Sequence, residues 1–147
     1  MKKYQKFLRK GIIQPLQNIP FHHKGPLQRI LMQDDTTFPD LTSILPGSNY
    51  HIAVHIIKKL PKKVPPYVDF HAHNCDEINL ILSESGKLVY EINFEDKEKY
   101  KVSSPAIFYI PRGVKHKVQV KKGSGVYVCI VMSKTYKSSL IKISKQK

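Results

Sequence analysis

Short apolar segments of strand length recur along the second two-thirds of the chain. From Tyr50 onward, runs rich in β-branched and aromatic residues are separated by proline, glycine, serine and lysine, and none has the 3.6-residue period of an amphipathic helix. The segments that we expect to be strands are His51–Lys59, Val68–His73, Glu77–Leu82, Leu88–Phe94, Lys99–Val102, Ile107–Ile110, His116–Val120 and Val126–Ser133. Many short strands at close spacing indicate an all-β sandwich or barrel.

The first third of the chain has a different pattern. Residues 3–10 can form a short basic helix, whereas residues 11–26 are rich in proline and are typical of an extended arm with little regular structure. Residues 27–32 are a possible strand, and residues 34–49 look like a loop with a helical turn in it. We therefore divide the chain into an irregular N-terminal arm at 1–49, a β-barrel at 50–135 and a basic C-terminal tail at 136–147.

Length and composition agree with one globular domain. The 147 residues, 41% of them hydrophobic, can bury a sizeable core. The longest apolar runs, such as "GVYVCIVM" at 125–132, are too short to span a bilayer, and the basic N-terminus has no apolar core of a secretory signal. Two cysteines, Cys75 and Cys129, make no disulfide framework. We expect a cytoplasmic protein with no membrane segment.

The net charge of +14 comes almost entirely from lysine. Only Arg9, Arg29 and Arg112 among the 25 basic residues are arginine, which leaves 25 − 3 = 22 lysines. Proteins that read nucleic-acid sequence favour arginine, because its guanidinium matches guanine and phosphate with two hydrogen bonds. No helix-turn-helix, zinc-finger or RNA-binding signature accompanies the charge. The lysines therefore indicate a solvated surface or attraction of small anions, and a nucleic-acid partner is not expected.

Histidines and carboxylates gather in the stretch "FHAHNCDE". His71 and His73 share one face if the segment is a strand, because side chains alternate along a strand. Asp76 and Glu77 have opposite parity on the next strand, so that one points inward, and their flanks do not settle which. After the turn "PRG", His116 opens a further strand and is expected to face inward with the two valines at i+2 and i+4.

Two spaced motifs carry a resemblance to a known family. His71-x-His73-x3-Glu77 and Pro111-x-Gly113-x2-His116 resemble the two conserved motifs of the cupin superfamily, in particular the small single-domain, type-2-like and RmlC-like cupins. The resemblance covers about residues 65–131. It implies a cupin-type jelly-roll barrel in which His71, His73, Glu77 and His116 bind one divalent metal ion. It departs from the family pattern where prolines replace two glycines, at Pro65 and Pro105.

The resemblance also implies a range of functions. The ion would be Fe(II) in an oxygenase, while Zn, Mn, Ni and Cu suit the same ligands. The protein is then expected to be a metal-dependent enzyme acting on a small, anionic molecule by dioxygenase, isomerase or lyase chemistry. One alternative is a non-catalytic small-molecule-binding or sensor cupin, and a weaker one is a basic protein associated with nucleic acid. Because cupins commonly pair through strands at the barrel edge, we expect a homodimer.

Three further residues are candidates for a catalytic role. Asn79 has the parity of Glu77 and should project into the barrel. His55 can line the mouth of the pocket as an acid–base group, or it can lie on a solvated face opposite apolar neighbours. Tyr127 shares its parity with Cys129, and the pattern does not decide whether this pair or the alternating valine–isoleucine pair faces inward. The pair His22–His23 in the arm is expected at the surface.

Overall fold

The computed structural model describes residues 2–5, 8, 11–16, 19–32, 49–84, 87–95 and 97–142. Its elements, in chain order, are β1 (Gly11–Pro15), β2 (Gln28–Met32), β3 (His51–Ile57), β4 (Glu77–Leu82), β5 (Val89–Phe94), β6 (Lys99–Ser103), β7 (Ala106–Ile110), β8 (His116–Lys122), β9 (Gly125–Val131) and the helix α1 (Tyr136–Ser139). The loop expected at 34–49 lies almost wholly outside the described residues, and the helix expected at 3–10 lies only partly within them.

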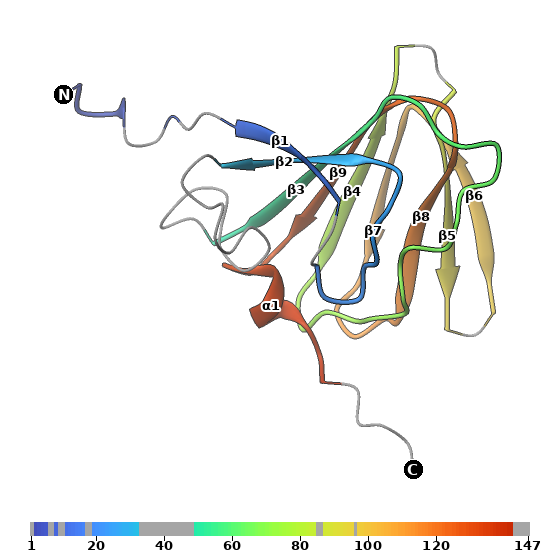
Figure 1. The fold of residues 1–147 in the computed structure, drawn as a ribbon. Coiled ribbons are helices and arrows are strands. Elements are labelled where there is room, and N and C mark those ends of the chain that lie inside the picture. The colour runs from blue at the N-terminus through green and yellow to red at the C-terminus, as the bar shows by residue number, and fades with distance from the viewer. Residues whose placement is uncertain are drawn as a thin grey trace.

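The strands form two antiparallel sheets. The larger has the order β1-β2-β3-β9-β4-β7, and the smaller has the order β6-β5-β8. Figure 1 shows the smaller sheet beside the larger one, with α1 near one end of β3 and β9. Apolar side chains from both sheets meet in the core, among them Ile81 of β4, Tyr90 of β5 and Val120 of β8, each at most 1% exposed. The expected all-β architecture is confirmed.

Most strand predictions agree closely with the structure. The segment Glu77–Leu82 is a strand over those same residues, and the others differ by at most two residues at either end. The exception is Val68–His73, which is not a strand. Its residues make isolated bridges to three different partners, His22, His116 and Leu140. Because no single neighbour runs alongside the segment, no continuous ladder forms.

The N-terminal arm contributes to the larger sheet. β1 pairs with β2, and β2 pairs with β3, which adds two strands beyond the barrel predicted from the sequence. The strand β1 was not predicted, because Pro15 reads as a breaker. At the end of an edge strand, however, proline costs no ladder hydrogen bond.

The segment after β9 is also ordered. Thr135 caps α1, and its side chain accepts a hydrogen bond from the backbone N–H of Ser138. Two of the four helical residues, Tyr136 and Ser139, are buried. No helix in the described part of the chain has the length to cross a bilayer. The division of the chain into arm, barrel and tail stays a prediction, but the segment predicted as a tail begins with residues that pack inward.

Gly123, in the turn between β8 and β9, offers a test of this packing. Its φ is +94°, and an added Cβ would lie 1.9 Å from the carbonyl oxygen of Lys87. We expect Gly123→Ala to lower the free energy of unfolding by about 3 kcal/mol, from backbone strain and overpacking together. Gly113→Ala is the control, because Gly113 also has a positive φ but has open space around it. Thermal unfolding should show a clearly smaller loss for Gly113→Ala, and equal losses would contradict the prediction.

Candidate metal centre

Three buried histidines converge on one point of the barrel interior. His71 and His73 come from the segment before β4, and His116 is the first residue of β8. Backbone hydrogen bonds in both directions between His71 and His116 hold the two segments together. One ligand atom from each histidine lies within 4.8 Å of the others.

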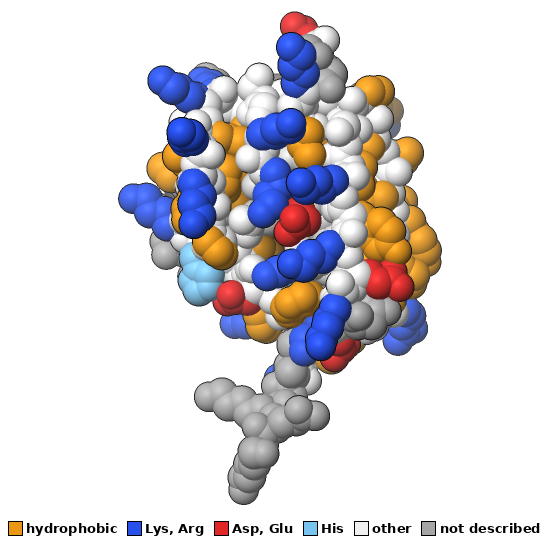
Figure 2. Space-filling model, turned by 90° about the vertical axis from the view of Figure 1, so that its right-hand side faces the viewer, with side chains coloured by type: hydrophobic (Ala, Val, Ile, Leu, Met, Phe, Trp, Pro, Cys, Tyr) orange, Lys and Arg blue, Asp and Glu red, His pale blue; other side chains and the backbone are white. Residues whose placement is uncertain are grey.

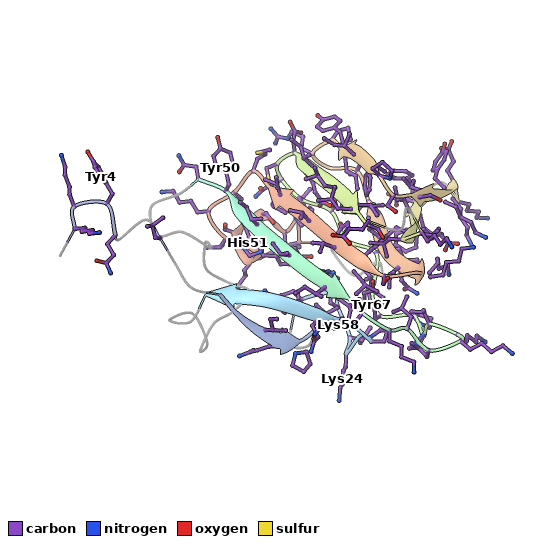
Figure 3. The ribbon with its side chains drawn as sticks, turned by 90° about the horizontal axis from the view of Figure 1, so that it is seen from above. Tyr4, Lys24, Tyr50, His51, Lys58 and Tyr67 are labelled. Carbon is purple, nitrogen blue, oxygen red and sulfur yellow. The ribbon has the colours of Figure 1, made fainter. Side chains whose placement is uncertain are left out.

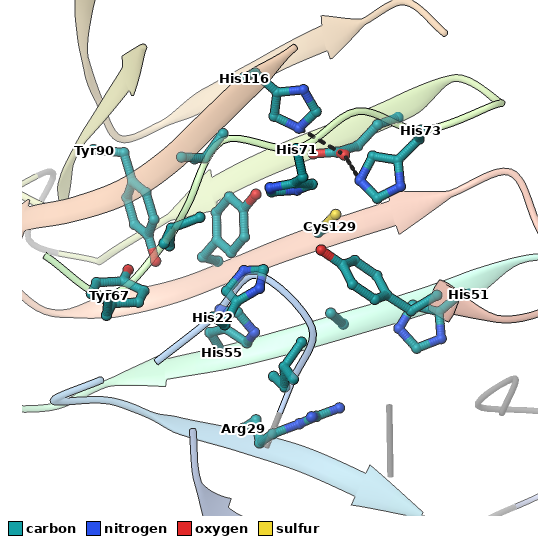
Figure 4. A pocket seen from close by; sticks show the side chains of 17 residues that line it. His22, Arg29, His51, His55, Tyr67, His71, His73, Tyr90, His116 and Cys129 are labelled. Atoms are coloured by element: carbon teal, nitrogen blue, oxygen red, sulfur yellow. Dashed lines mark ion pairs between the residues drawn. The ribbon is translucent and has the colours of Figure 1, made fainter. Parts of the chain in front are cut away.

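Glu77 completes a set of four at the start of β4. Its Oε2 atom lies 3.1 Å from Nε2 of His73 and 3.4 Å from Nε2 of His116 (Figure 4). Glu77 is 3% exposed, and so Glu77 rather than Asp76 faces inward. The backbone N–H of Arg112 donates to Asp76, which places that carboxylate at the surface turn. The structure thus brings together the four residues predicted as metal ligands.

Backbone carbonyls orient two of the three imidazoles. Nδ1 of His71 lies 2.9 Å from the carbonyl oxygen of Asp69, and Nδ1 of His116 lies 2.8 Å from that of Val114. A carbonyl can only accept a hydrogen bond, so each Nδ1 carries a proton, and in the neutral imidazole the lone pair is on Nε2. This is the arrangement in which a histidine binds a metal through Nε2.

A serine from α1 orients the third imidazole. Nδ1 of His73 lies 2.7 Å from Oγ of Ser139, and this hydroxyl lies 2.5 Å from the carbonyl oxygen of Tyr136. The hydroxyl donates its proton to that carbonyl and therefore accepts the hydrogen bond from His73. The tautomer of His73 thus matches that of His71 and His116.

Three of the atoms that face one another in the site lack a hydrogen-bond partner among the described residues. Nε2 of His73, Nε2 of His116 and Oε2 of Glu77 are buried, and none makes a contact of hydrogen-bond geometry within the described residues, despite their short separations. Unsatisfied buried polar atoms are costly, and a cation among them would satisfy all three. Imidazole nitrogens with one carboxylate suit a divalent transition ion. The site fits a metal.

Burial and charge set the protonation of the four residues. Burial lowers the pKa of His71 to about 3, so its imidazole is neutral over the usual pH range. Burial alone would raise the pKa of Glu77, but His116 and His73 outweigh it and hold that pKa well below its ordinary value. Burial alone would lower the pKa of His116, but Glu77 raises it above the usual range. The metal-free site therefore holds an ion pair.

The contact between His73 and Ser139 can be tested by metal affinity. We expect Ser139→Ala to weaken metal binding by about 10–100-fold, because loss of an outer hydrogen-bond partner frees the ligand to rotate. The measurement is a competition titration against a chromophoric chelator. Ser138→Ala is the matched control, since this neighbouring side chain is exposed and its hydroxyl bonds to Ser133 and Thr135 and not to a candidate metal ligand. Equal affinities for the two variants would contradict this role of Ser139.

The four residues line a cavity between the sheets. It leaves about 40 Å³ of space for water-sized molecules. Six of the seven histidines of the chain line it, and only the exposed His23 does not. The residues on the remaining walls include His22, Arg29, His51, His55, Tyr67, Tyr90, Tyr127, Cys129 and Tyr136. The cavity suits a metal ion with a small ligand.

The candidate catalytic residues all lie at the cavity or directly behind its wall. His55 is 6% exposed, and its ring centroid lies 5.5 Å from that of Tyr127. Asn79 is fully buried and accepts a hydrogen bond from the hydroxyl of Tyr127. The pair Tyr127 and Cys129 faces inward, which the sequence pattern left open. The roles of His55, Asn79 and Tyr127 stay predictions.

The solvated-face alternative for the histidines of β3 is wrong. His51 and His55 are both buried against the cavity, and Ile52, Val54 and Ile56 lie on the other face of the sheet. Figure 3 shows Tyr50 and His51, neighbours at the start of β3, pointing to opposite sides. The alternation was read correctly, but the sheet has apolar residues on both faces, so hydrophobicity did not reveal which one is inside.

Several cavity residues were missed by the sequence reading. His22 was expected at the surface, but its ring lies 5.6 Å from that of His71, and burial of the ring lowers its pKa to about 4. Arg29 and Tyr136 also line the cavity, and Ser139 orients a ligand from behind. No local signal marks these residues, because they reach the cavity through contacts between distant parts of the chain.

Comparisons with known proteins reveal similarity of structure only. No protein-family model matches the chain, and no curated protein matches it. The polyketide cyclase RemF from Streptomyces resistomycificus is similar at a TM-score of 0.51 and 12% identity, over 99% of this chain and 88% of that one. A cupin 2 conserved barrel domain protein from Rhodopseudomonas palustris has a TM-score of 0.51 and 13% identity, over 82% and 70%. A cupin-like protein from Thermotoga maritima has a TM-score of 0.50 and 13% identity, over 85% and 78%. At these identities the likeness concerns the fold.

Proposed function

We propose that this chain, which has the cupin fold, is a divalent-metal protein and an enzyme that acts on a small anionic molecule coordinated at the metal. One observation carries the proposal. Three buried imidazoles present Nε2 to a common point beside a buried carboxylate, with each Nδ1 occupied by an acceptor. His71, His73, Glu77 and His116 would hold the ion, Fe(II) for dioxygenase chemistry or Zn, Mn, Ni or Cu for isomerase or lyase chemistry.

The residues around the four ligands define what the site can do. A bound ion would supply Lewis acidity or a redox centre. The enclosing walls exclude bulk water, and Tyr127, whose pKa burial raises well above its ordinary value, keeps its proton as a hydrogen-bond donor. Asn79 fixes the direction of that hydroxyl. The polyketide cyclase among the similar structures supports an enzyme, and the small cavity supports a small substrate.

Elemental analysis tests the proposal. Protein purified without added metal, without a histidine tag and under anaerobic conditions free of chelator should contain close to one equivalent of a transition ion. Absence of metal from such a preparation would overturn the proposal. A non-catalytic sensor would instead show metal and tight ligand binding with no turnover in a metabolite screen. A nucleic-acid-binding protein would stay on immobilised DNA at physiological salt with a steep salt dependence.

We also propose that two copies pair through the outer face of the larger sheet. The outward side chains of four strands are all apolar: Ile52, Val54, Ile56, Ile78, Leu80, Leu82, Ile107, Tyr109, Val126, Val128 and Ile130. Ile107 and Tyr109 of β7 are 70% and 56% exposed. The smaller sheet, in contrast, presents lysines around few acids (Figure 2). Two chains of net charge +14 meet with least repulsion through the face that carries no charge.

Sedimentation tests the pairing. We expect the mass of two chains for the natural sequence and of one chain for Ile107→Glu, because a charge in an apolar interface is left without solvent. Tyr100→Glu, on the opposite sheet, is the control and should stay dimeric. A monomeric natural chain would refute the pairing without affecting the metal proposal. The proposed location is the cytoplasm, where Cys75 and Cys129, which are free thiols, would stay reduced.

A further inference from the structure

We infer that the hydroxyl of Tyr136, on α1, is a second recognition point of the cavity and donates a hydrogen bond to the ligand held at the metal centre. The ligand would then be a small carboxylate, with one oxygen at the metal and the other at Tyr136. This inference rests on the proposed function, because it takes the metal as the first point of attachment.

The hydroxyl of Tyr136 is buried and has no hydrogen-bond partner among the described residues. The residue is 6% exposed and lines the same cavity as the four candidate metal ligands. A buried hydroxyl without a partner is costly to a folded protein, and such groups are therefore rare. A ligand oxygen in the cavity would supply the missing hydrogen-bond acceptor.

Ring contacts place Tyr136 beside the metal centre. Its ring centroid lies 5.3 Å from that of His73 and 6.3 Å from that of His71. The same ring lies 5.7 Å from the ring of His51, on β3. Figure 4 shows His73 and His51 on different walls of the cavity. Tyr136 therefore lies between these walls, where a small molecule at the metal centre would meet it.

The helix that carries Tyr136 is attached to the segment that carries His73. The backbone N–H of Asn74 donates to the carbonyl oxygen of Ser139, and its side-chain amide donates to that of Ser138, at 2.6 and 3.0 Å. The hydroxyl of Ser139 also accepts the hydrogen bond from Nδ1 of His73. These bonds fix α1 relative to the metal centre, so that Tyr136 is positioned before a ligand binds.

A phenol hydroxyl beside a metal centre favours a ligand with two oxygens. The phenol carries its proton at neutral pH and can donate one hydrogen bond. An ion with open coordination positions can take one oxygen of the ligand, which leaves the second oxygen for the hydroxyl. Hydrogen bonds to a charged oxygen are the stronger ones. A carboxylate offers both oxygens and the charge, and a cavity of about 40 Å³ restricts it to a short one.

Ligand titrations of the cobalt-loaded protein test this recognition point. The probes are formate and acetate, and their binding is followed by the visible absorption of Co(II). We expect Tyr136→Phe to bind both anions at least about 10-fold more weakly than the natural chain, because a hydrogen bond to a charged group is lost. Tyr100→Phe is the matched control and should bind like the natural chain, since the hydroxyl of Tyr100 donates to Glu98 at the surface of the smaller sheet.

A second measurement separates ligand recognition from a structural role. Without a ligand, Tyr136→Phe should keep the metal affinity of the natural chain and its stability to urea, because the deleted hydroxyl has no partner among the described residues. A variant that loses stability, fails to fold or binds metal more weakly would overturn the inference. The hydroxyl would then serve the fold or the metal centre rather than a ligand.

The outcomes separate this inference from the proposed function. Metal content is measured on the same samples, and a natural chain that binds no metal would overturn both. A metal-loaded natural chain that binds neither formate nor acetate would overturn recognition by Tyr136 and leave the metal proposal standing. Equal affinities of the natural chain and Tyr136→Phe for the two anions would do the same.

Discussion

Replacing His116 by alanine is expected to weaken the binding of a divalent ion by more than ~100-fold. Loss of an outer partner of a ligand already costs about 10–100-fold, and loss of the ligand itself costs more. His116 is 1% exposed, and its Nε2 lies 3.4 Å from Oε2 of Glu77. The three histidines bring their ligand atoms within 4.8 Å of one another, so the substitution removes one of three imidazole ligands.

The measurement is a chelator competition titration combined with elemental analysis. His23→Ala is the matched control, because His23 is exposed and pairs with Asp69 at the surface. The control variant should bind metal as the natural chain does. If His116→Ala keeps the affinity of His23→Ala, then the four residues do not form the metal centre, and the proposed function fails with them.

Glu77→Gln is expected to have the second large effect. The amide keeps the shape of the side chain but removes the only negative charge among the four residues. We expect metal affinity to fall by about 100-fold, because a divalent ion loses its one anionic ligand. The metal-free protein should also lose stability, by roughly 3–5 kcal/mol, the usual cost of removing one partner from a buried ion pair. Chelator competition and urea unfolding measure the two effects separately.

The same substitution should change how the stability of the metal-free protein depends on pH. The pKa of Glu77 is lowered on folding, so its contribution is present above about pH 4.5 and is lost as pH falls through the lower folded value. The pKa of His116 is raised on folding, so its contribution is present below about pH 6.5 and is lost as pH rises through the higher folded value. The pair of Glu77 and His116 should therefore contribute most to the stability of the metal-free protein between about pH 5 and 6.

Above about pH 6, metal affinity should rise with pH while the stabilising contribution of the pair falls. An imidazole must be neutral to bind a metal, so affinity should rise with pH as His116 loses its proton. The loss of stability in Glu77→Gln should therefore be largest near pH 5–6. Urea unfolding of the metal-free natural chain and variant across pH 4–9 measures this loss, and a loss that does not change with pH would show that the pair of Glu77 and His116 does not form.

The strand pattern was enough to predict the fold class, and the resemblance of two spaced motifs to the cupin superfamily implied the four central residues. Alternation along single strands predicted the two faces of β4 and β8, and the family resemblance carried by two short motifs implied His71, His73, Glu77 and His116. These features repeat at intervals of two to five residues, over which the backbone of a strand or turn has a nearly constant geometry. The spacing of residues within such a segment therefore predicts the direction in which each side chain points. The same reasoning failed for Val68–His73, where three different partners replace one ladder.

Only the tertiary structure decided what surrounds those four residues. His22 and Arg29 reach the cavity from the N-terminal arm, and Tyr136 and Ser139 reach it from beyond β9. The bond between His73 and Ser139 joins residues 66 positions apart. The distance between these two side chains depends on how two sheets and a helix pack together. No short-range repeat in the sequence encodes that packing. By itself the sequence determined where a metal can bind, and the packing of distant segments decided which side chains a substrate would meet there.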